Sequence, residues 1–391
     1  MQVDLEHPPG PRELVSEPGR HLWIEVVRDS LVLGVEHSWS PDGTVSPDTV
    51  GRLRQRYGPE TSTHHPHVSD GDLPSISVVV PTVHQNASLL LRTVRSLCEL
   101  DYPDFEILVV DNRPGELDPP MPDLSDIARV RVVAEAQSGT SAARNRGVAE
   151  SLNDIVAFTD DDAVVDRHWL KALGEVFVGS PHVDGVSGLV LPSEIDSPPQ
   201  LWFEEFYGGF NHSFGAEVLD LEHRSEFGTL FPYSPAMYGA GCNMAFRRQV
   251  LQGLGGFPTA LGPGTPARGG EDLAVCIESV LRGGRYAFAP SALVRHTHRT
   301  TEEAFLRQVF GYGVGLSAMF TYLVARDPRR LTDLLRRVPE GVKRLRGPRD
   351  SRNLSTRTTY PRRAHLIQLL GLAYGPVALA ISVTQSHRRA R

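Results

Sequence analysis

Residues 155–162 read Ile-Val-Ala-Phe-Thr-Asp-Asp-Asp, a short apolar run that ends in three consecutive carboxylates. The run is typical of a buried strand, and Asp160, Asp161 and Asp162 follow where it ends. Three like charges repel one another unless a cation lies among them, and hard divalent cations prefer carboxylate oxygens. The stretch therefore indicates either a site for a divalent cation that bridges to a diphosphate, or an exposed acidic turn.

Strand and helix patterns alternate around this stretch. Apolar runs at 76–80, 105–110 and 129–133 predict strands, and the segments 88–100 and 140–152 between them predict helices. This alternation indicates an α/β domain with a mixed, mostly parallel sheet flanked by helices. Ligands of such sheets bind at the carboxyl ends of the strands, so polar residues at those ends are candidates for chemistry.

A second acidic pair, Glu271-Asp272, follows two glycines and opens an apolar helix. Carboxylates at a helix N-terminus are stabilised by the helix dipole, so capping is one interpretation. The other interpretation is a general base, which must sit within reach of a reacting hydroxyl. The sequence of this motif alone favours neither.

Three further polar motifs each allow a structural and a functional interpretation. Asp111 and Asn112 follow the strand at 105–110 and form either a polar turn or acceptors for a base or ribose. Arg144 lies in a segment of small residues, and it is either a solvated arginine or a phosphate ligand. His296 and His298 alternate beside arginines; a single histidine is usually structural, but one imidazole here could complete a metal site.

Taken in order, these motifs resemble the family 2 glycosyltransferases of the GT-A fold, over residues 76 to about 299. The matching stretches are Val78-Val79-Val80-Pro81-Thr82, Leu108-Val109-Val110-Asp111-Asn112, Ala142-Ala143-Arg144-Asn145-Arg146-Gly147, Phe158-Thr159-Asp160-Asp161-Asp162, Gly241-Cys242-Asn243-Met244-Ala245-Phe246-Arg247-Arg248 and Gly270-Glu271-Asp272. The Gly-Gly-Glu-Asp motif at 269–272 is similar to that of polypeptide GalNAc-transferase-like enzymes. Each stretch is weak alone, and their order and spacing make the match specific.

The resemblance implies a metal-dependent, inverting transfer of one sugar from a nucleotide-diphosphate sugar, expected to be a UDP-sugar, to a hydroxyl. Asp272 would deprotonate that hydroxyl, with Glu271 beside it. Asp160 and Asp162 would form the two ends of a DXD motif and, with His296, hold Mn²⁺ or Mg²⁺. The residues that would bind the nucleotide sugar are Pro81, Thr82, Asp111, Asn112, Arg144, Asn145, Asp160, Asp161, Gly241 and Asn243.

Two departures from the family pattern refine this expectation. Asp111-Asn112-Arg113-Pro114 stands where Asp-Asp-Gly-Ser is common, which weakens the assignment of uridine. The Gln-x-x-Arg-Trp motif of processive synthases is absent after Asp272, which favours transfer of a single sugar over polymerisation.

The chain divides into four expected parts. Residues 1–60 predict a small β-rich module with a hairpin, 61–74 a linker, 75–300 the glycosyltransferase domain, and 301–391 a basic helical tail. The net charge of the chain is −7, yet the residues after 324 carry sixteen Arg or Lys against four Asp or Glu. Such a tail suits an anionic surface, and we expect a membrane.

The end of the tail holds an uncharged run at 364–386, long enough to cross a bilayer. Pro339 is expected to kink or split the amphipathic helix before it, and Gly375-Pro376 to break or kink the run itself. Spanning the membrane, lying on its surface and packing on the protein itself all remain open.

Composition and cysteine spacing exclude several classes. With 40% hydrophobic and 22% charged residues, the chain of 391 residues is not disordered throughout. Its three cysteines form no CxxC pair, so zinc ribbons, thioredoxin motifs and disulfide frameworks are unsupported, and buried free thiols are expected. No signal peptide pattern is visible, so we expect a cytoplasmic protein, peripheral at the inner face of the cell membrane.

Three other functions deserve comparison. A sugar nucleotidyltransferase needs a Gly-rich, basic loop after the first strand, and Val83-His84-Gln85-Asn86 is neither. A catalytically inactive, membrane-docked binding protein is disfavoured by the intact carboxylates. Nucleic acid is not an expected partner, because the tail offers only Tyr360 and Tyr374 for base stacking.

Overall fold

The computed structural model describes residues 2–5, 20–29, 31–40, 42–58, 68–83, 86–113, 121–211, 213–346 and 360–389. Half of the predicted linker, at 61–67, lies outside these residues, and so does the segment 347–359 of the tail.

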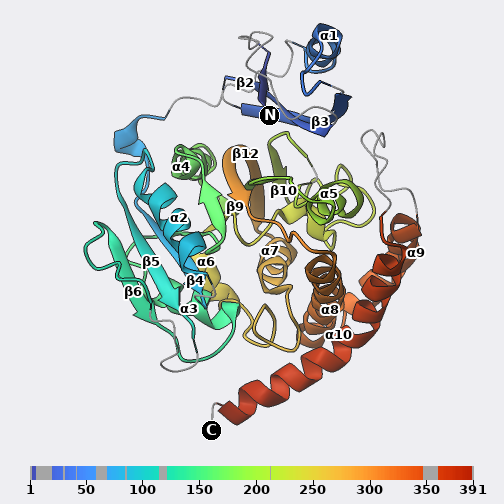
Figure 1. Ribbon diagram of the computed structural model, residues 1–391. Helices are drawn as coiled ribbons and strands as arrows, with labels where there is room; N and C mark the ends of the chain where they lie inside the picture. The colour runs from blue at the N-terminus through green and yellow to red at the C-terminus, as the bar shows by residue number, and fades with distance from the viewer. Residues whose placement is uncertain are drawn as a thin grey trace.

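A nine-stranded mixed sheet forms the centre of the molecule (Figure 1). Its strand order is β10-β12-β9-β11-β7-β4-β5-β6, and β8 pairs with β12. The strands are β4 (Ile76–Thr82), β5 (Phe105–Asp111), β6 (Val130–Ala134), β7 (Ile155–Phe158), β8 (Ala163–Val165), β9 (Val183–Pro192), β10 (Glu217–Leu219), β11 (Met244–Arg247) and β12 (Arg285–His296). Strands β6, β5, β4, β7, β9 and β12 run in one direction, whereas β8, β10 and β11 run against them. The expected mixed, mostly parallel sheet is confirmed.

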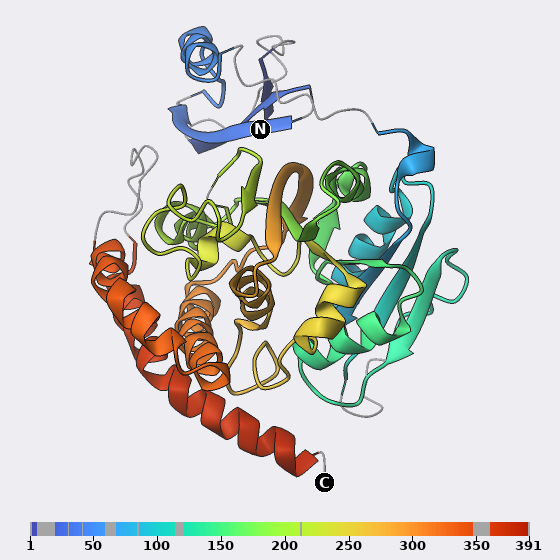
Figure 2. The same ribbon diagram turned by 180° about the vertical axis from the view of Figure 1, so that it is seen from behind.

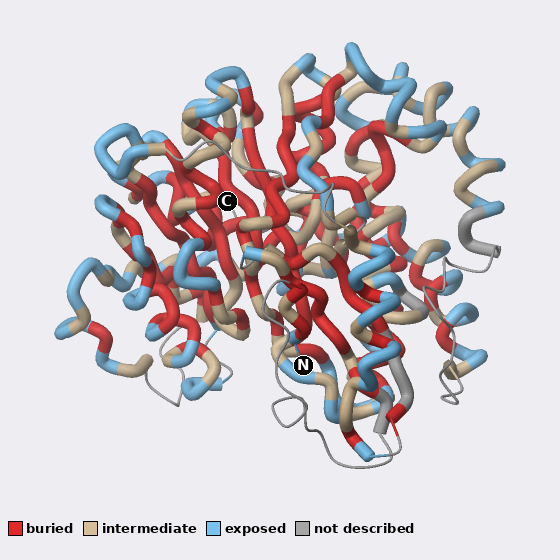
Figure 3. Tube along the Cα trace, turned by 90° about the horizontal axis from the view of Figure 1, so that it is seen from above, coloured by how far each residue is buried: buried red, intermediate tan, exposed pale blue. Residues whose placement is uncertain are grey.

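Helices cover both faces of this sheet because its central strands are apolar on both faces. Side chains alternate along β4, so Val78 packs with α2 (Ala87–Cys98) and α4 (Trp169–Gly179) on one face. Val79 faces the opposite way, toward α3 (Thr140–Glu150), α6 (Arg248–Leu254) and α7 (Glu271–Leu281). Figure 3 shows the resulting layers, with the buried parts of the chain concentrated along the strands. The carboxyl ends of β4, β5, β7 and β12 share one edge, where the candidate residues gather.

The first residues form a small separate sheet, as predicted, but with a helix that the sequence analysis missed. Strands β1 (Gln2–Asp4), β2 (Arg20–Arg28) and β3 (Leu31–Ser40) pair in that order, and α1 (Pro47–Arg56) follows. The β2–β3 hairpin packs on β9 and β12. Both terminal nitrogens of Arg295 lie 2.7 Å from the carboxylate oxygens of Glu25, which ties this sheet to β12.

Three long helices form the tail: α8 (Glu302–Arg326), α9 (Arg330–Arg346) and α10 (Arg362–Arg389). The expected split at Pro339 and the expected break at Gly375-Pro376 are wrong, because both helices continue through their prolines. A proline inside a helix removes one hydrogen bond, and in α10 close packing along α8 offsets that loss. Figure 2 shows α10 beside α8, with its free end far from the N-terminal sheet.

Two of these helices meet the length and composition of a membrane span. They are α8 and the part of α10 from Arg362 to Ser386. One face of each is buried against the rest of the protein, as happens equally in the core helix of a soluble domain.

Candidate active site

A cavity of about 2090 Å³ opens at the carboxyl edge of the sheet. Most of the residues predicted from the sequence line it: Pro81, Thr82, Asn112, Arg144, Asp160, Asp161, Asp162, Gly241, Glu271, Asp272 and His296. The N-terminal sheet contributes Trp23 and Val35 to the same wall, and the tail helices close another side. Segments from the whole length of the chain therefore meet at one site.

The three consecutive aspartates point to three different partners. Asp161 accepts a hydrogen bond from the Thr82 hydroxyl at 2.5 Å. Asp162 Oδ1 lies 3.2 Å from Nε2 of His296, and Asp160 Oδ1 lies 3.2 Å from a terminal nitrogen of Arg144. This divergence lowers the mutual repulsion that three adjacent carboxylates would otherwise suffer.

These partners shift the pKa values in different directions. Burial raises the pKa of Asp161 to about 6 in spite of its bond to Thr82, and burial also raises the pKa of Asp160. Burial opposes ionisation of Asp162 as well, but the imidazole of His296 outweighs it and lowers the pKa of that carboxyl. Asp162 and His296 thus form a charged pair at the C-terminal end of β12.

A buried ion pair links this cluster to the N-terminus of α7. Arg144, 3% exposed in its side chain, donates to Glu271 Oε1 at 2.8 Å, and Glu271 is 4% exposed. Arg144 also donates to the carbonyl of Gly241 at 3.2 Å. Burial, followed by the neighbouring Asp272 carboxylate, raises the pKa of Glu271 to about 7. Arg144 therefore bonds both acidic motifs and is not a solvated arginine, while its predicted contact with a phosphate stays a prediction.

Asp272 is held by two backbone N–H groups. Gly241 donates to its Oδ2 at 2.9 Å and Leu273 donates to its Oδ1 at 2.8 Å. A Cβ on Gly241 would lie 2.7 Å from Arg144 and 2.8 Å from Asp272, so any larger residue would displace one of these charged groups. Gly270, at φ +85°, supplies the left-handed turn that starts α7 and directs Glu271 and Asp272 into the cavity.

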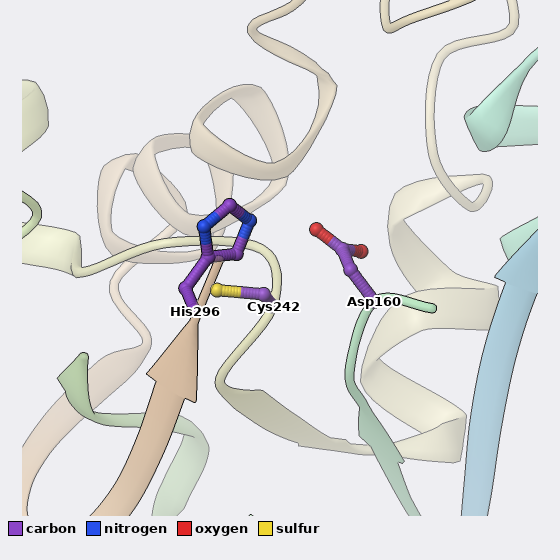
Figure 4. A group of neighbouring side chains, drawn as sticks. All are labelled: Asp160, Cys242 and His296. Atoms are coloured by element: carbon purple, nitrogen blue, oxygen red, sulfur yellow. The ribbon is translucent and has the colours of Figure 1, made fainter. Parts of the chain in front are cut away.

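His296, His298 and Glu204 form a row of polar contacts that starts beside Asp162. His296 Nδ1 lies 3.4 Å from Nδ1 of His298, and His298 Nε2 lies 2.6 Å from Oε1 of Glu204. Asp160, Cys242 and His296 place one donor atom each within 4.8 Å of one another (Figure 4). The sequence analysis set Cys242 aside as a buried thiol and gave no role to Glu204.

Three predicted residues do not line the cavity. Asp111 pairs with Arg113, with 2.6 Å between oxygen and nitrogen. Asn145 bonds both the backbone N–H and the carbonyl of Phe257. Asn243 is buried, accepts from the indole N–H of Trp169 and donates to two backbone carbonyls. Asn145 and Asn243 thus hold the loops that frame the site.

Comparison with known proteins identifies the family to which this fold belongs. The family model described as Glycosyl transferase family 2 matches residues 77–255. Glucosyl-dolichyl phosphate glucuronosyltransferase of Haloferax volcanii is 29% identical over 274 residues, which cover 66% of this chain and 83% of that protein. Pre-mycofactocin glycosyltransferase of Mycobacterium tuberculosis is 30% identical over 260 residues, and the match spans 65% of this chain but only 49% of that protein.

A solved structure is similar at greater distance. The mannosyltransferase PcManGT from Pyrobaculum calidifontis, in complex with GDP-Man and Mn²⁺, is 20% identical, with a TM-score of 0.44 over 81% of this chain and 75% of that chain.

The fold and the family match define the class: this is a sugar-transferring enzyme on a GT-A-like α/β scaffold. The chain belongs to the family 2 glycosyltransferases.

Proposed function

We propose that this glycosyltransferase is metal-dependent, inverting and non-processive. It moves one sugar from a nucleotide-diphosphate sugar, a UDP-sugar in our first proposal, to a hydroxyl of a lipid-linked or glycan acceptor. The observation that carries the proposal is the meeting of two carboxylate sets in one cavity: Asp160 and Asp162 after β7, and Glu271 and Asp272 at the start of α7. An inverting transfer needs a cation-binding group at the diphosphate and a base on the opposite side of the sugar.

The residues that would hold Mn²⁺ or Mg²⁺ are Asp160, Asp162 and His296. They fit a divalent cation because carboxylate oxygens and an imidazole nitrogen face one polar end of the cavity, with Asp162 and His296 already 3.2 Å apart. When bound, the cation would neutralise charge on the departing diphosphate. Pro81, Thr82, Asn112 and Asp161 would line the nucleotide part of the cavity.

Asp272 would accept the proton of the acceptor hydroxyl. Its two backbone donors fix the orientation of the carboxylate before substrate arrives, which removes a reorganisation cost from the reaction. Glu271 would keep Arg144 in place beside it, as its 2.8 Å ion pair supports. No covalent nucleophile is needed for a single displacement.

A membrane surface is the proposed location of the acceptor. The outer face of α10 exposes Leu366, Leu369, Leu370, Tyr374, Val377 and Ile381. Its opposite face is buried against α8, which supports a helix lying on the membrane surface at the inner face of the cell membrane. The name of the Haloferax volcanii relative refers to a dolichyl-phosphate-linked sugar, which supports a lipid-linked acceptor here too.

Two matched variants test this division of labour. Asp162→Asn should abolish metal-dependent donor binding, because it removes a charged ligand. Asp272→Asn should leave donor binding intact and remove transfer, because the amide cannot accept the proton. Calorimetry measures binding, and release of nucleoside diphosphate in the presence of acceptor measures transfer. Full transfer by Asp272→Asn would disprove the assignment of the base, and donor hydrolysis by the wild type would exclude an inactive binding protein.

A further inference from the structure

We propose that Cys242 is a metal ligand in this site and that the centre formed by Asp160, Cys242 and His296 binds thiophilic divalent cations, Co²⁺ and Zn²⁺. The inference rests on the metal site of the proposed function and extends it with a sulfur ligand. Figure 4 shows the three side chains converging from separate segments: the loop after β7, the turn before β11 and the end of β12. Their donor atoms lie within 4.8 Å of one another, which one cation can bridge.

The thiol of Cys242 is buried at the cavity wall. The residue is 2% exposed and lines the cavity. Among the residues that the structure describes, no hydrogen-bond partner is recorded for this thiol, although carboxylates and an imidazole surround it. The polarisable sulfur therefore lies beside a carboxylate and an imidazole without a hydrogen bond to either. A metal ligand would occupy such a position.

The backbone on both sides of Cys242 is fixed. Gly241 donates to Asp272 and accepts from Arg144, and the Asn243 N–H bonds the carbonyl of Ala240. The Asn243 side chain adds three further bonds to buried partners. The sulfur is therefore preorganised, which a ligand in a designed or natural metal site requires.

The hydrogen bonds of His298 and Glu204 determine that His296 faces the site with Nε2. Glu204 is acceptor-only when ionised, so His298 carries its proton on Nε2 and accepts on Nδ1. His296 then donates from Nδ1 to His298 and faces Asp162 with Nε2, so the proton that Nε2 carries in the charged pair would leave when a cation binds there. A carboxylate behind a ligating histidine commonly sets the tautomer in this way.

A carboxylate, an imidazole and a thiolate form a softer set than the oxygen ligands that Mg²⁺ prefers. Affinity for such a set rises from Mn²⁺ through Co²⁺, and zinc is well suited to Cys and His ligands. As the metal–sulfur bond forms, the thiol proton leaves to solvent, so binding is charge-balanced and involves no oxidation. Zn²⁺ should therefore compete with Mn²⁺ or Mg²⁺ for the site.

Cobalt titration of the full-length protein tests the proposal directly. A thiolate bound to Co²⁺ gives a near-ultraviolet charge-transfer absorption, which we expect in the wild type and in the control Cys98→Ser. Cys98 is exposed on α2 and lies outside the cavity lining. Cys242→Ser and Cys242→Ala should lose the band, and circular dichroism verifies that each variant is folded.

Metal affinities give a second readout. Loss of an outer-shell partner already costs about 10–100-fold in metal affinity, so loss of the ligand Cys242 should weaken Zn²⁺ binding by at least about tenfold relative to Mn²⁺. A band that persists without Cys242, Co²⁺ binding without a band, or an unchanged ratio of Zn²⁺ to Mn²⁺ affinity would overturn the proposal. If nucleotide binding depends on Mn²⁺ but the band is absent, only the assignment of Cys242 as a ligand is wrong. If no divalent cation binds at all, the metal dependence in the proposed function is wrong as well.

Discussion

Arg144 organises the charges of the site. Its guanidinium bonds Glu271, Asp160 and the carbonyl of Gly241, all at the buried end of the cavity. A buried cation is tolerated only when it is paired, and removal of one partner of such a pair typically costs about 3–5 kcal/mol. We therefore regard Arg144 as the residue that positions the acidic groups.

Glu271 makes the stability of this protein depend on pH. Its pKa is raised from 4.5 to about 7, first by burial and then by Asp272. The folded state thus binds this proton more tightly than the unfolded chain, and the associated stability, full below the unfolded pKa, is lost as the pH rises toward the folded one. Between pH 4.5 and about 7, the free energy of unfolding should fall less steeply in Glu271→Gln than in the wild type.

Urea unfolding at several pH values, with a chelator present, measures both slopes. Groups remote from Glu271 are common to the two proteins and cancel in the comparison. Parallel curves would contradict the assignment of a raised pKa to Glu271.

Sequence spacing located the acidic residues well but did not distinguish the residues that face the cavity from those that hold its loops. Thr82, Asp160, Asp161 and Asp162 line the cavity because they sit at carboxyl ends of parallel strands, a position that follows from the pattern. Asn145 belongs to an equally motif-like stretch, yet its amide bonds the backbone of Phe257, over a hundred residues along the chain. No local pattern encodes such a long-range contact.

Small residues set the distance between α8 and α10. A Cβ on Gly371 would lie 2.5 Å from the carbonyl oxygen of Phe310, and a Cβ on Gly313 would lie 2.5 Å from that of Gln368. Backbone atoms meet here without side chains between them, so the two helices touch along much of their length (Figure 2). This contact is consistent with α10 continuing as one helix through Pro376.

The same substitution at two glycines should therefore have opposite effects. Gly371→Ala should lower the free energy of unfolding by about 1–3 kcal/mol, because the added methyl group overpacks the contact. Gly341→Ala, in α9, meets no atom within 4 Å and should raise it by about 0.5–1 kcal/mol through the better helix propensity of alanine. Chemical denaturation compares the two, and a stabilised Gly371→Ala protein would contradict close packing of α8 on α10.

Helices were predictable where their apolar stripe was wide. The helices α2 and α8 show such a stripe, whereas α1 has only Val50 and Leu53 as large apolar residues and escaped detection. Its capping signal, Ser46 before Pro47 with the serine accepting from the Thr49 N–H, was present in the sequence. Conversely, the prolines of α9 and α10 predicted interruptions, but both helices continue, and in α10 close packing on α8 offsets the lost hydrogen bond.

The basic tail, formed by α8, α9 and α10, lies along one side of the cavity. The exposed apolar face of α10 and the excess of arginine in the tail suit an anionic lipid surface, with electrostatic attraction that salt weakens. Because α9 and α10 also line the cavity, an acceptor held in the membrane would lie close to the site.

Vesicle binding tests this arrangement. Burial of an exposed leucine contributes about 1.5–3 kcal/mol, so the double variant Leu369→Glu/Leu370→Glu should bind vesicles containing anionic lipid at least about tenfold more weakly. Leu152→Glu is the matched control, because Leu152 is 74% exposed in the turn after α3 and should leave binding unchanged. Co-sedimentation at low and high salt provides the measurement, and equal binding by the wild type and the double variant would disprove docking through α10.

The central claim is that Asp160, Asp162 and His296 form a cation-dependent nucleotide site. Calorimetric titration of the full-length protein with UDP, GDP and dTDP, each with and without Mn²⁺, tests it most directly. We predict that one of the three nucleotides, UDP in the first place, binds only when the metal is present, and that Asp162→Asn abolishes this binding. Binding that is equally strong without metal, or no binding of any of the three with metal, would contradict the account.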